Sequence, residues 1–286
     1  MGRMECAALP SRAMHHPVRY CALLPPSYDS SPTARYPVLY WLHGIGENEQ
    51  VFIDAGGWNV VERLREDKRI GEFILITPDG DSTFFVNSRD GRRPWEDFFL
   101  REFLPTIEHE YRVRPGRANR AISGISMGGY GALHLAFRHP ELFGAVSAHS
   151  AALMKSPPAG AVDASASNSQ VRALQAAFGK QASGSATSGS AAQQTKSLVF
   201  DDAYWQANNP LQLARTAQLA GLKIYFDCGQ QDNYGFDAGA ITLDKELSAR
   251  KIAHEFHLDP GQHDWVFAAQ HLPLSLEFHW KRFTEK

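Results

Sequence analysis

The hydrophobic residues of this 286-residue chain fall into two recurring patterns. One is a short, near-continuous apolar run, which is typical of a strand covered on both faces of a sheet. The other is an apolar residue at every third or fourth position, which predicts a helix with one buried face. The apolar runs cover residues 37–44, 72–80, 142–150 and 222–229, with a more alternating strand at 252–259. The helical pattern covers residues 57–67, 95–111, 127–140, 201–209, 236–250 and 264–283, with a kink or break expected at Pro105.

Two segments depart from this alternation. Residues 3–9 and 18–25 are short β-type runs joined by a polar turn, which predicts a hairpin. Residues 151–197 are rich in Ala, Ser, Gly and Gln, a composition that buries little surface. Within them, residues 171–178 are apolar enough for one short helix. A surface insertion and a lid over a cleft both fit this segment, because it directly follows a strand end.

Strands that alternate with helices through short connections predict a mostly parallel sheet with helices on both faces. The N-terminal hairpin adds an antiparallel part to this sheet. We expect residues 1–286 to form a single α/β domain, with residues 151–197 as a flexible insertion or lid.

Composition and charge narrow the function classes. The formal net charge is −2, so neither a nucleic-acid surface nor an anionic membrane surface is expected. No apolar run approaches the roughly 18 residues of a membrane helix, and the N-terminal residues lack the apolar core of a signal peptide. We therefore expect a cytoplasmic protein, with export after removal of a leader left open. The chain has twelve histidines, but the closely spaced pairs His15-His16 and His254/His257 lack carboxylate or cysteine partners at ligand spacing, so no metal or other cofactor is expected.

The three cysteines give no disulfide framework. Cys6 and Cys21 lie in the two runs of the predicted hairpin, and whether they pair is open. Cys228 lies in an apolar run and is expected to be a small core residue.

The pattern Gly-x-Ser-x-Gly at residues 124–128 stands between a strand-like segment and a predicted helix. A serine placed there sits on a tight, strained turn that exposes its hydroxyl above the sheet, and the glycines remove collisions. The amides at the start of the following helix suit a developing negative charge. The pattern predicts that Ser126 is a nucleophile; a Gly-rich turn with a capping serine is the alternative.

A serine nucleophile needs a histidine base on another loop. His263 follows the last predicted strand and precedes the last helix. The other late histidines lie inside that strand or helix and are expected to be structural: His254, His257, His271 and His279. Trp265, two residues beyond His263, is a candidate for contact with the substrate.

The base needs a carboxylate that fixes its tautomer and stabilises its charged form. Asp232 lies in the loop after the strand at residues 222–229 and is the predicted acid. Asp227 lies inside that strand, and Asp237 lies in the first turn of the next helix, where an acid favours the helix dipole. The chain order of serine, aspartate and histidine is the one expected of an α/β-hydrolase.

Main-chain donors for an oxyanion are expected at two places. One is the N–H of Met127, directly after the predicted nucleophile. The other is the His-Gly turn after an early strand, where the N–H of Ile45 is favoured over that of Gly44. His43 in this turn is expected to orient it rather than to act as a second base.

Together these residues resemble the putative-esterase branch of the α/β-hydrolases, which includes feruloyl and acetyl-xylan esterases, esterase D (S-formylglutathione hydrolase) and the mycolyltransferases. The resemblance implies an α/β-hydrolase fold and a serine hydrolase with Ser126, Asp232 and His263 as its triad and main-chain donors near Ile45 and Met127. The long insertion departs from compact members, so substrate shape does not carry over. The matching stretches are residues 35–49, 95–113, 121–150, 225–232 and 261–267, with residues 84–98 more like the feruloyl esterases.

The leading hypothesis is a serine carboxylic-ester hydrolase that works through an acyl-enzyme on feruloyl, acetyl or short-chain acyl esters. Its expected partner is a small-molecule or carbohydrate-linked ester, and its expected assembly is a monomer or homodimer. The same machinery serves a thioesterase of the S-formylglutathione hydrolase type, or an acyltransferase in which an alcohol replaces water. A non-catalytic, hydrolase-like binding protein is the alternative from a different class.

Overall fold

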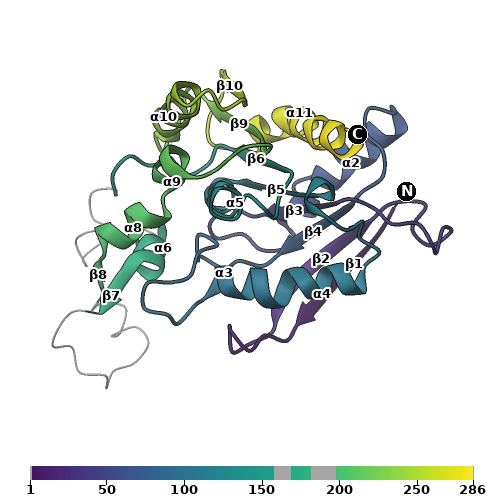
Figure 1. The fold of residues 1–286 in the computed structure, drawn as a ribbon, viewed down its shortest axis with the longest axis horizontal. Coiled ribbons are helices and arrows are strands. Elements are labelled where there is room, and N and C mark those ends of the chain that lie inside the picture. Colours follow the sequence, from purple (N-terminus) through teal and green to yellow (C-terminus); the bar gives the residue numbers. More distant parts are fainter. Residues whose placement is uncertain (1, 158–168, 182–197, 286) are drawn as a thin grey trace.

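Eight strands form one central sheet in a computed structural model that describes residues 2–157, 169–181 and 198–285 (Figure 1). The strand order is β1-β2-β4-β3-β5-β6-β9-β10. The pairs β1–β2 and β2–β4 are antiparallel, and neighbours from β4 to β10 pair in parallel. The predicted mostly parallel sheet with an antiparallel hairpin is confirmed. The strands are β1 (Arg3–Leu9), β2 (Val18–Leu24), β3 (Val38–Leu42), β4 (Ile74–Pro78), β5 (Arg120–Ile125), β6 (Ala145–His149), β9 (Lys223–Gly229) and β10 (Glu255–Asp259).

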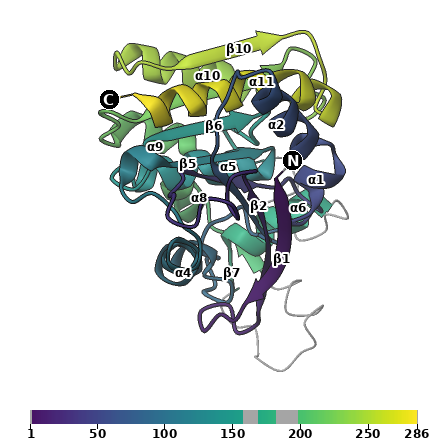
Figure 2. The same ribbon diagram turned by 90° about the vertical axis from the view of Figure 1, so that its right-hand side faces the viewer.

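Helices cover both faces of this sheet. α2 and α11 pack against each other on one face, and α4 lies on the other (Figures 1 and 2). The helices are α1 (Val51–Asp54), α2 (Gly57–Glu66), α3 (Trp95–Phe98), α4 (Leu104–Glu110), α5 (Met127–Arg138), α6 (Ser169–Phe178), α8 (Asp202–Asn208), α9 (Pro210–Thr216), α10 (Phe236–Ala249) and α11 (Trp265–Thr284), with a π-helical turn η1 (Phe99–Phe103) and a 3₁₀ turn η2 (Arg117–Asn119).

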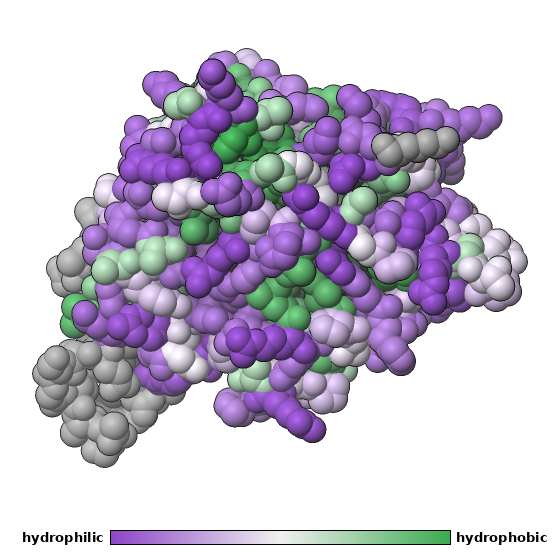
Figure 3. Space-filling view, viewed as in Figure 1, coloured by the Kyte–Doolittle hydropathy of each residue, from purple (hydrophilic) through white to green (hydrophobic). Residues whose placement is uncertain are grey.

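The apolar strands are buried on both faces, as their sequence predicts. In β3, Tyr40 and Leu42 join the cluster that contains α5, whereas Leu39 and Trp41 join the cluster under α2 and α11. Successive side chains of a strand point to opposite faces, so an uninterrupted apolar run supplies two cores at once. Most of the surface seen from the side of Figure 1 is hydrophilic (Figure 3). None of the helices in the described ranges combines the length and hydropathy that a membrane crossing requires.

The helical segment predicted over residues 95–111 is continuous but changes its winding. α3 passes into η1, which passes into α4, and Pro105 lies in the first turn of α4. Proline lacks an N–H, and its ring collides with the carbonyl four residues earlier in a regular α-helix. A wider π-turn directly before the proline relieves this conflict. The irregularity expected at Pro105 therefore takes the form of a wider turn rather than a break.

The N-terminal hairpin carries a disulfide. Cys6 and Cys21 face each other in the register of β1 and β2, and their sulfur atoms are bonded. The question that the sequence left open is thus answered by the strand register. Cys228 is a buried free thiol, as expected.

The described part of the predicted insertion packs on the main body. Residues 171–178 lie within α6, which confirms the short helix predicted there. Leu174 and Phe178 are buried, and the Phe178 ring contacts those of Phe84 and Tyr130. After α6, the short strand β7 (Gly179–Gln181) pairs with β8 (Leu198–Phe200). Residues 158–168 and 182–197 lie outside the described residues, so the choice between lid and surface insertion stays a prediction.

Candidate active site

Ser126 sits on a sharp turn between β5 and α5. Its backbone angles are φ 55° and ψ −116°, a conformation that residues other than glycine rarely adopt. The N–H of Ser126 donates to the carbonyl of His149 at 2.9 Å, which fixes the turn to the end of β6. A Cβ atom at Gly124 would lie 2.4 Å from the backbone of Gly128, and one at Gly128 would lie 2.0 Å from the carbonyl oxygen of Leu42. The strained turn predicted from the sequence is present, and its glycines allow backbone segments to approach closely.

The predicted base and acid meet Ser126 in one line of hydrogen bonds. His263 Nε2 lies 2.9 Å from Ser126 Oγ, and His263 Nδ1 lies 2.8 Å from Asp232 Oδ2. A carboxylate oxygen accepts, so Nδ1 carries the proton and Nε2 is left to accept from the serine. The structure therefore brings together the three residues that the sequence selected.

Asp232 is held in place from both of its oxygens. Its Oδ1 accepts from the N–H groups of Tyr234 and Phe236, and Oδ2 also accepts from the Cys228 thiol at 3.5 Å. Burial alone raises the pKa of Asp232, but the hydrogen bonds from His263 and the two backbone amides outweigh burial and keep the pKa below its ordinary value. The carboxylate is therefore ionised and oriented next to the imidazole.

The residues that the sequence passed over have other partners. Asp227 binds His149 at 2.7 Å with both side chains fully buried, and Asp237 lies in the first turn of α10. His254 binds Asp244, and His271 binds Asp259. Burial lowers the pKa of His279 to about 3, and this ring binds Ser147 far from the surface. Their structural assignment agrees with these contacts.

Of the two residues expected to donate main-chain N–H groups to an oxyanion, Met127 directly follows Ser126 and Ile45 lines the same cavity as Ser126. Met127 is the first residue of α5, so its N–H has no partner within the helix. Gly44 N donates to Glu47 Oε2 at 2.6 Å, which removes Gly44 as a donor to substrate and leaves the N–H of Ile45. His43 is buried and accepts from the N–H of Gly80 at 2.8 Å. His43 Nδ1 also lies 2.7 Å from the carbonyl oxygen of Gly44, so the ring contacts the turn that it was expected to orient.

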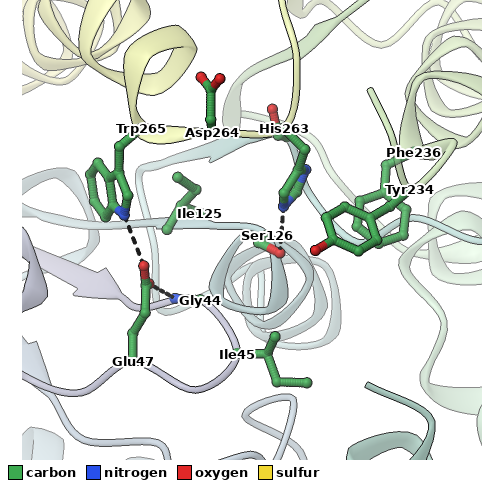
Figure 4. A pocket seen from close by; sticks show the side chains of 11 residues that line it. Gly44, Ile45, Glu47, Ile125, Ser126, Tyr234, Phe236, His263, Asp264 and Trp265 are labelled. Carbon is green, nitrogen blue, oxygen red and sulfur yellow. Dashed lines mark hydrogen bonds between the residues drawn. The ribbon is translucent and has the colours of Figure 1, made fainter. Parts of the chain in front are cut away.

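A cavity of about 270 Å³ opens over the serine. Figure 4 shows Trp265 on one side of it and Tyr234 and Phe236 on the other, with Ser126 and His263 between them. The predicted substrate contact Trp265 is thus a wall of this cavity. The lining residues are Gly44, Ile45, Glu47, Ile125, Ser126, Ser150, Tyr234, Phe236, His263, Asp264 and Trp265.

Sequence reasoning missed several members of this wall. Tyr234 and Phe236 follow the predicted acid by two and four residues, and their rings pack edge-to-face (T-shaped) with the His263 ring. Their closeness to Asp232 in the chain was a usable signal. Glu47 gave a weaker signal, because its contacts to a backbone N–H and to the Trp265 indole join residues 3 and 218 positions away.

No group of three or more histidine, cysteine, aspartate or glutamate side chains arranged to hold a metal ion occurs in the described part of the chain.

The sheet is mostly parallel and covered by helices, and a serine stands on a strand-to-helix turn. Its acid and its histidine follow in the chain. These features define an α/β-hydrolase fold. Within that class the chain belongs to the family described as putative esterases, whose family model matches residues 11–276.

Known relatives point the same way. The chain is 34% identical over 114 residues to an endo-1,4-beta-xylanase/feruloyl esterase of Xylanibacter ruminicola, and 37% identical over 134 residues to an esterase of Mycobacterium tuberculosis. These matches cover 38% and 45% of this chain, but only 16% and 28% of the two relatives, so the chain spans a minor part of their length.

Solved structures match over almost the whole chain. A ferulic acid esterase shares 27% identity with a TM-score of 0.76, covering 99% of this chain and 98% of its own. An S-formylglutathione hydrolase from Agrobacterium tumefaciens reaches a TM-score of 0.73 at 17% identity, covering 99% and 96%. The second likeness shows the shared fold alone.

Proposed function

We propose that this chain is a serine hydrolase of carboxylic esters, with Ser126 as nucleophile, His263 as base and Asp232 as the orienting acid. The observation that carries the proposal is the continuous hydrogen-bond line from Asp232 through His263 to Ser126, at 2.8 and 2.9 Å, on the floor of an open cavity. Membership of the putative-esterase family and the names of its relatives support the same activity.

The reaction follows from the direction of each hydrogen bond. As Ser126 Oγ attacks the ester carbonyl carbon, His263 Nε2 takes the hydroxyl proton, and Asp232 stabilises the resulting imidazolium. The carbonyl oxygen becomes an oxyanion that accepts from the N–H groups of Ile45 and Met127. The imidazolium then protonates the leaving alkoxide, which leaves an acyl-enzyme. Water adds to this ester with its proton going to Nε2, and Ser126 regains a proton as the acid departs.

The walls of the cavity favour an ester with an aromatic or short acyl group. Tyr234, Phe236 and Trp265 supply aromatic surface, and about 270 Å³ is near the lower end of small-molecule sites. The aromatic walls support our proposal of a feruloyl group attached to a small alcohol or a carbohydrate as one such substrate. Acetyl and short-chain acyl esters are the smaller members of the same substrate range.

Charge on the cavity wall disfavours a glutathione thioester. The described lining contains the carboxylates of Glu47 and Asp264 but no lysine or arginine. Glutathione carries carboxylates of its own, and this wall offers them no cationic side chain to pair with. We therefore rank thioester hydrolysis of this type below ester hydrolysis, and acyl transfer to an alcohol as a variant of the same acyl-enzyme chemistry.

The compartment is a separate part of the proposal. The sequence favours the cytoplasm, but the Cys6–Cys21 disulfide favours an oxidising compartment, because thiols are kept reduced in the cytosol. We propose that the protein acts outside the cytoplasm. Its proposed assembly is a monomer or a homodimer. Alkylation of denatured protein taken directly from its native host, followed by mass measurement, tests the compartment. Two cysteines that resist alkylation support the proposal, and alkylation of all three cysteines overturns it.

The activity is tested on Ser126. The Ser126→Ala variant should lose roughly 10⁴- to 10⁶-fold in kcat/KM toward p-nitrophenyl acetate while keeping its circular dichroism and melting temperature. A fluorophosphonate probe should label the parent at Ser126 and fail to label the variant. Methyl ferulate, p-nitrophenyl butyrate and S-formylglutathione assayed side by side rank the substrates. A folded parent that turns over none of them would favour the non-catalytic binding protein instead.

A further inference from the structure

Glu47 joins the two loops that face each other across Ser126. It lies in the loop after β3, three residues beyond Gly44. Its Oε2 accepts from the N–H of Gly44 at 2.6 Å, and its Oε1 accepts from the indole N–H of Trp265 at 2.8 Å (Figure 4). Trp265 begins α11 and stands two residues after His263. One carboxylate thus connects the loop of the oxyanion donor with the loop of the base.

Two contacts at Gly44, one from Glu47 and one from His43, hold the peptide groups on either side of its Cα atom. The carbonyl of Gly44 lies 2.7 Å from His43 Nδ1, so both polar backbone groups of Gly44 are held, one by Glu47 and one by His43. His43 Nε2 accepts from the N–H of Gly80, which places the ring proton on Nδ1 and makes it the donor to the Gly44 carbonyl. In a trans peptide the C=O and the following N–H point in opposite directions. Fixing the Gly44 carbonyl therefore aims the Ile45 N–H the other way.

The packing around Gly44 agrees with this arrangement. A Cβ atom at Gly44 would lie 2.7 Å from Glu47 Oε2 and 3.7 Å from the Ser126 Cβ. The carboxylate therefore occupies the space that a side chain at residue 44 would need. Both of its oxygens accept from N–H groups, which directs its negative charge toward these donors rather than toward the forming oxyanion.

We infer that Glu47 is a positioning residue for ester hydrolysis: it holds the His43–Gly44 peptide, next to the Gly44–Ile45 peptide that His43 holds, so that the Ile45 N–H faces the oxyanion, and it ties this loop through Trp265 to the loop of His263. The inference rests on the proposed function of Ser126. It assigns no proton transfer and no substrate contact to Glu47.

Variants at residues 47 and 265 test the inference, because each changes how many acceptor oxygens residue 47 offers or how many N–H donors it must serve. Glu47→Ala removes both contacts and should lower kcat by about 10- to 100-fold with KM changed by less than about 3-fold, because a misplaced oxyanion donor weakens the transition state. Glu47→Gln offers one oxygen to two N–H donors, so one donor faces the amide NH₂, and an intermediate loss is expected. Trp265→Phe removes one donor and keeps a ring, with a small loss.

The double variant is the discriminating one. In Glu47→Gln/Trp265→Phe the amide oxygen is free to accept from Gly44 alone, so kcat should be at least as high as in Glu47→Gln. Independent roles for the two residues would instead multiply their losses, which would overturn the inference. Glu49→Gln serves as the matched control, since it alters another carboxylate of the same loop that does not line the cavity.

Every kcat is expressed per site titrated with the fluorophosphonate probe, so that unfolded protein does not count. Affinity for an arylboronic acid, which forms a tetrahedral adduct with the serine, should fall in parallel with kcat/KM across the variants. Glu47→Ala with kcat within about 2-fold of the parent and a lowered melting temperature would show a merely structural role and overturn the inference. If Glu47→Ala does not fold, the single and double Gln variants decide. Failure of the proposed function has a different signature, namely no turnover and no labelling in the parent.

Discussion

A single methyl group added at Gly128 would meet the end of β3. The added Cβ would stand 2.0 Å from the Leu42 carbonyl oxygen and 2.6 Å from that of His43. These carbonyls belong to the backbone that leads into the loop of Ile45, so α5, which starts directly after Ser126, touches the start of that loop. The glycine therefore allows close approach between the two segments that we propose act on the substrate carbonyl.

Gly128→Ala should therefore affect both stability and rate. We expect a loss of about 1–3 kcal/mol in the free energy of unfolding from overpacking, and a fall in kcat of about 10-fold or more from displacement of the oxyanion loop. Urea unfolding and kcat per titrated site measure the two effects. Gly91→Ala is the control, because residue 91 has φ +74° in open space and should lose stability with kcat unchanged. A Gly128→Ala enzyme with normal kcat would contradict this account.

Among single residues, the sequence predicts those whose own side chain would take part in the reaction. Ser126, Asp232 and His263 were selectable because a nucleophile, an acid and a base must follow strand ends in a set order. Glu47 was not selectable, because its partners are a backbone N–H and an indole from a segment 218 positions later. Residues that act by holding backbone groups become visible only when the loops are placed in space.

Between elements, α3 and α5 are tied together by one buried carboxylate. Glu96 of α3 lies 3.1 Å from His134, 2.7 Å from His139 and 3.1 Å from Arg138. Burial raises the pKa of Glu96, but the hydrogen bonds from His134 and His139 outweigh burial and hold the pKa below its ordinary value. The folded protein therefore binds a proton at Glu96 less readily than the unfolded chain does.

This difference gives stability a defined dependence on pH. An unfolded glutamate titrates near pH 4.3, so the contribution of Glu96 is fully present above about pH 5 and is lost as pH falls toward the lower folded pKa. Glu96→Gln should cost about 3 kcal/mol at pH 7, and the gap to the parent should narrow in urea titrations toward pH 3. Glu141→Gln removes an exposed carboxylate near His139 and should change little. A gap that does not depend on pH would contradict the assignment.

Element positions were largely predictable, but local windings were not. The apolar runs and helical spacings located the central strands and most of the helices, but the predicted helical patterns did not cover α1 or α9. The π-turn before Pro105 was predicted only as an irregularity, since a proline within a helical pattern specifies a conflict without specifying how the neighbouring carbonyls resolve it. The Cys6–Cys21 pair depended on strand register, which the hydrophobic pattern alone leaves open for an edge strand as exposed as β1.

For the whole molecule, the hairpin at one edge of the sheet is closed covalently. The disulfide spans 15 residues, for which the chain-entropy treatment gives about 3 kcal/mol. Reductant should therefore lower the melting temperature of the parent by roughly 6–12 °C, at about 2–4 °C per kcal/mol for a larger domain. The Cys6→Ala/Cys21→Ala variant should melt at the lower temperature with or without reductant. Equal melting of the oxidised and reduced parent would contradict the pairing.

The pairing of β7 with β8 has a consequence for how this protein can vary. Gln181 stands opposite Leu198, so these two positions, 17 apart in the chain, are neighbours in space, and the nearby Phe178 and Phe200 are buried. When the ends of a connection are already held together, lengthening it adds only about 0.6 kcal/mol for each doubling. Evolution can therefore change the number of residues between these two strands, or insert a whole module there, without disturbing the elements that carry Ser126 and His263.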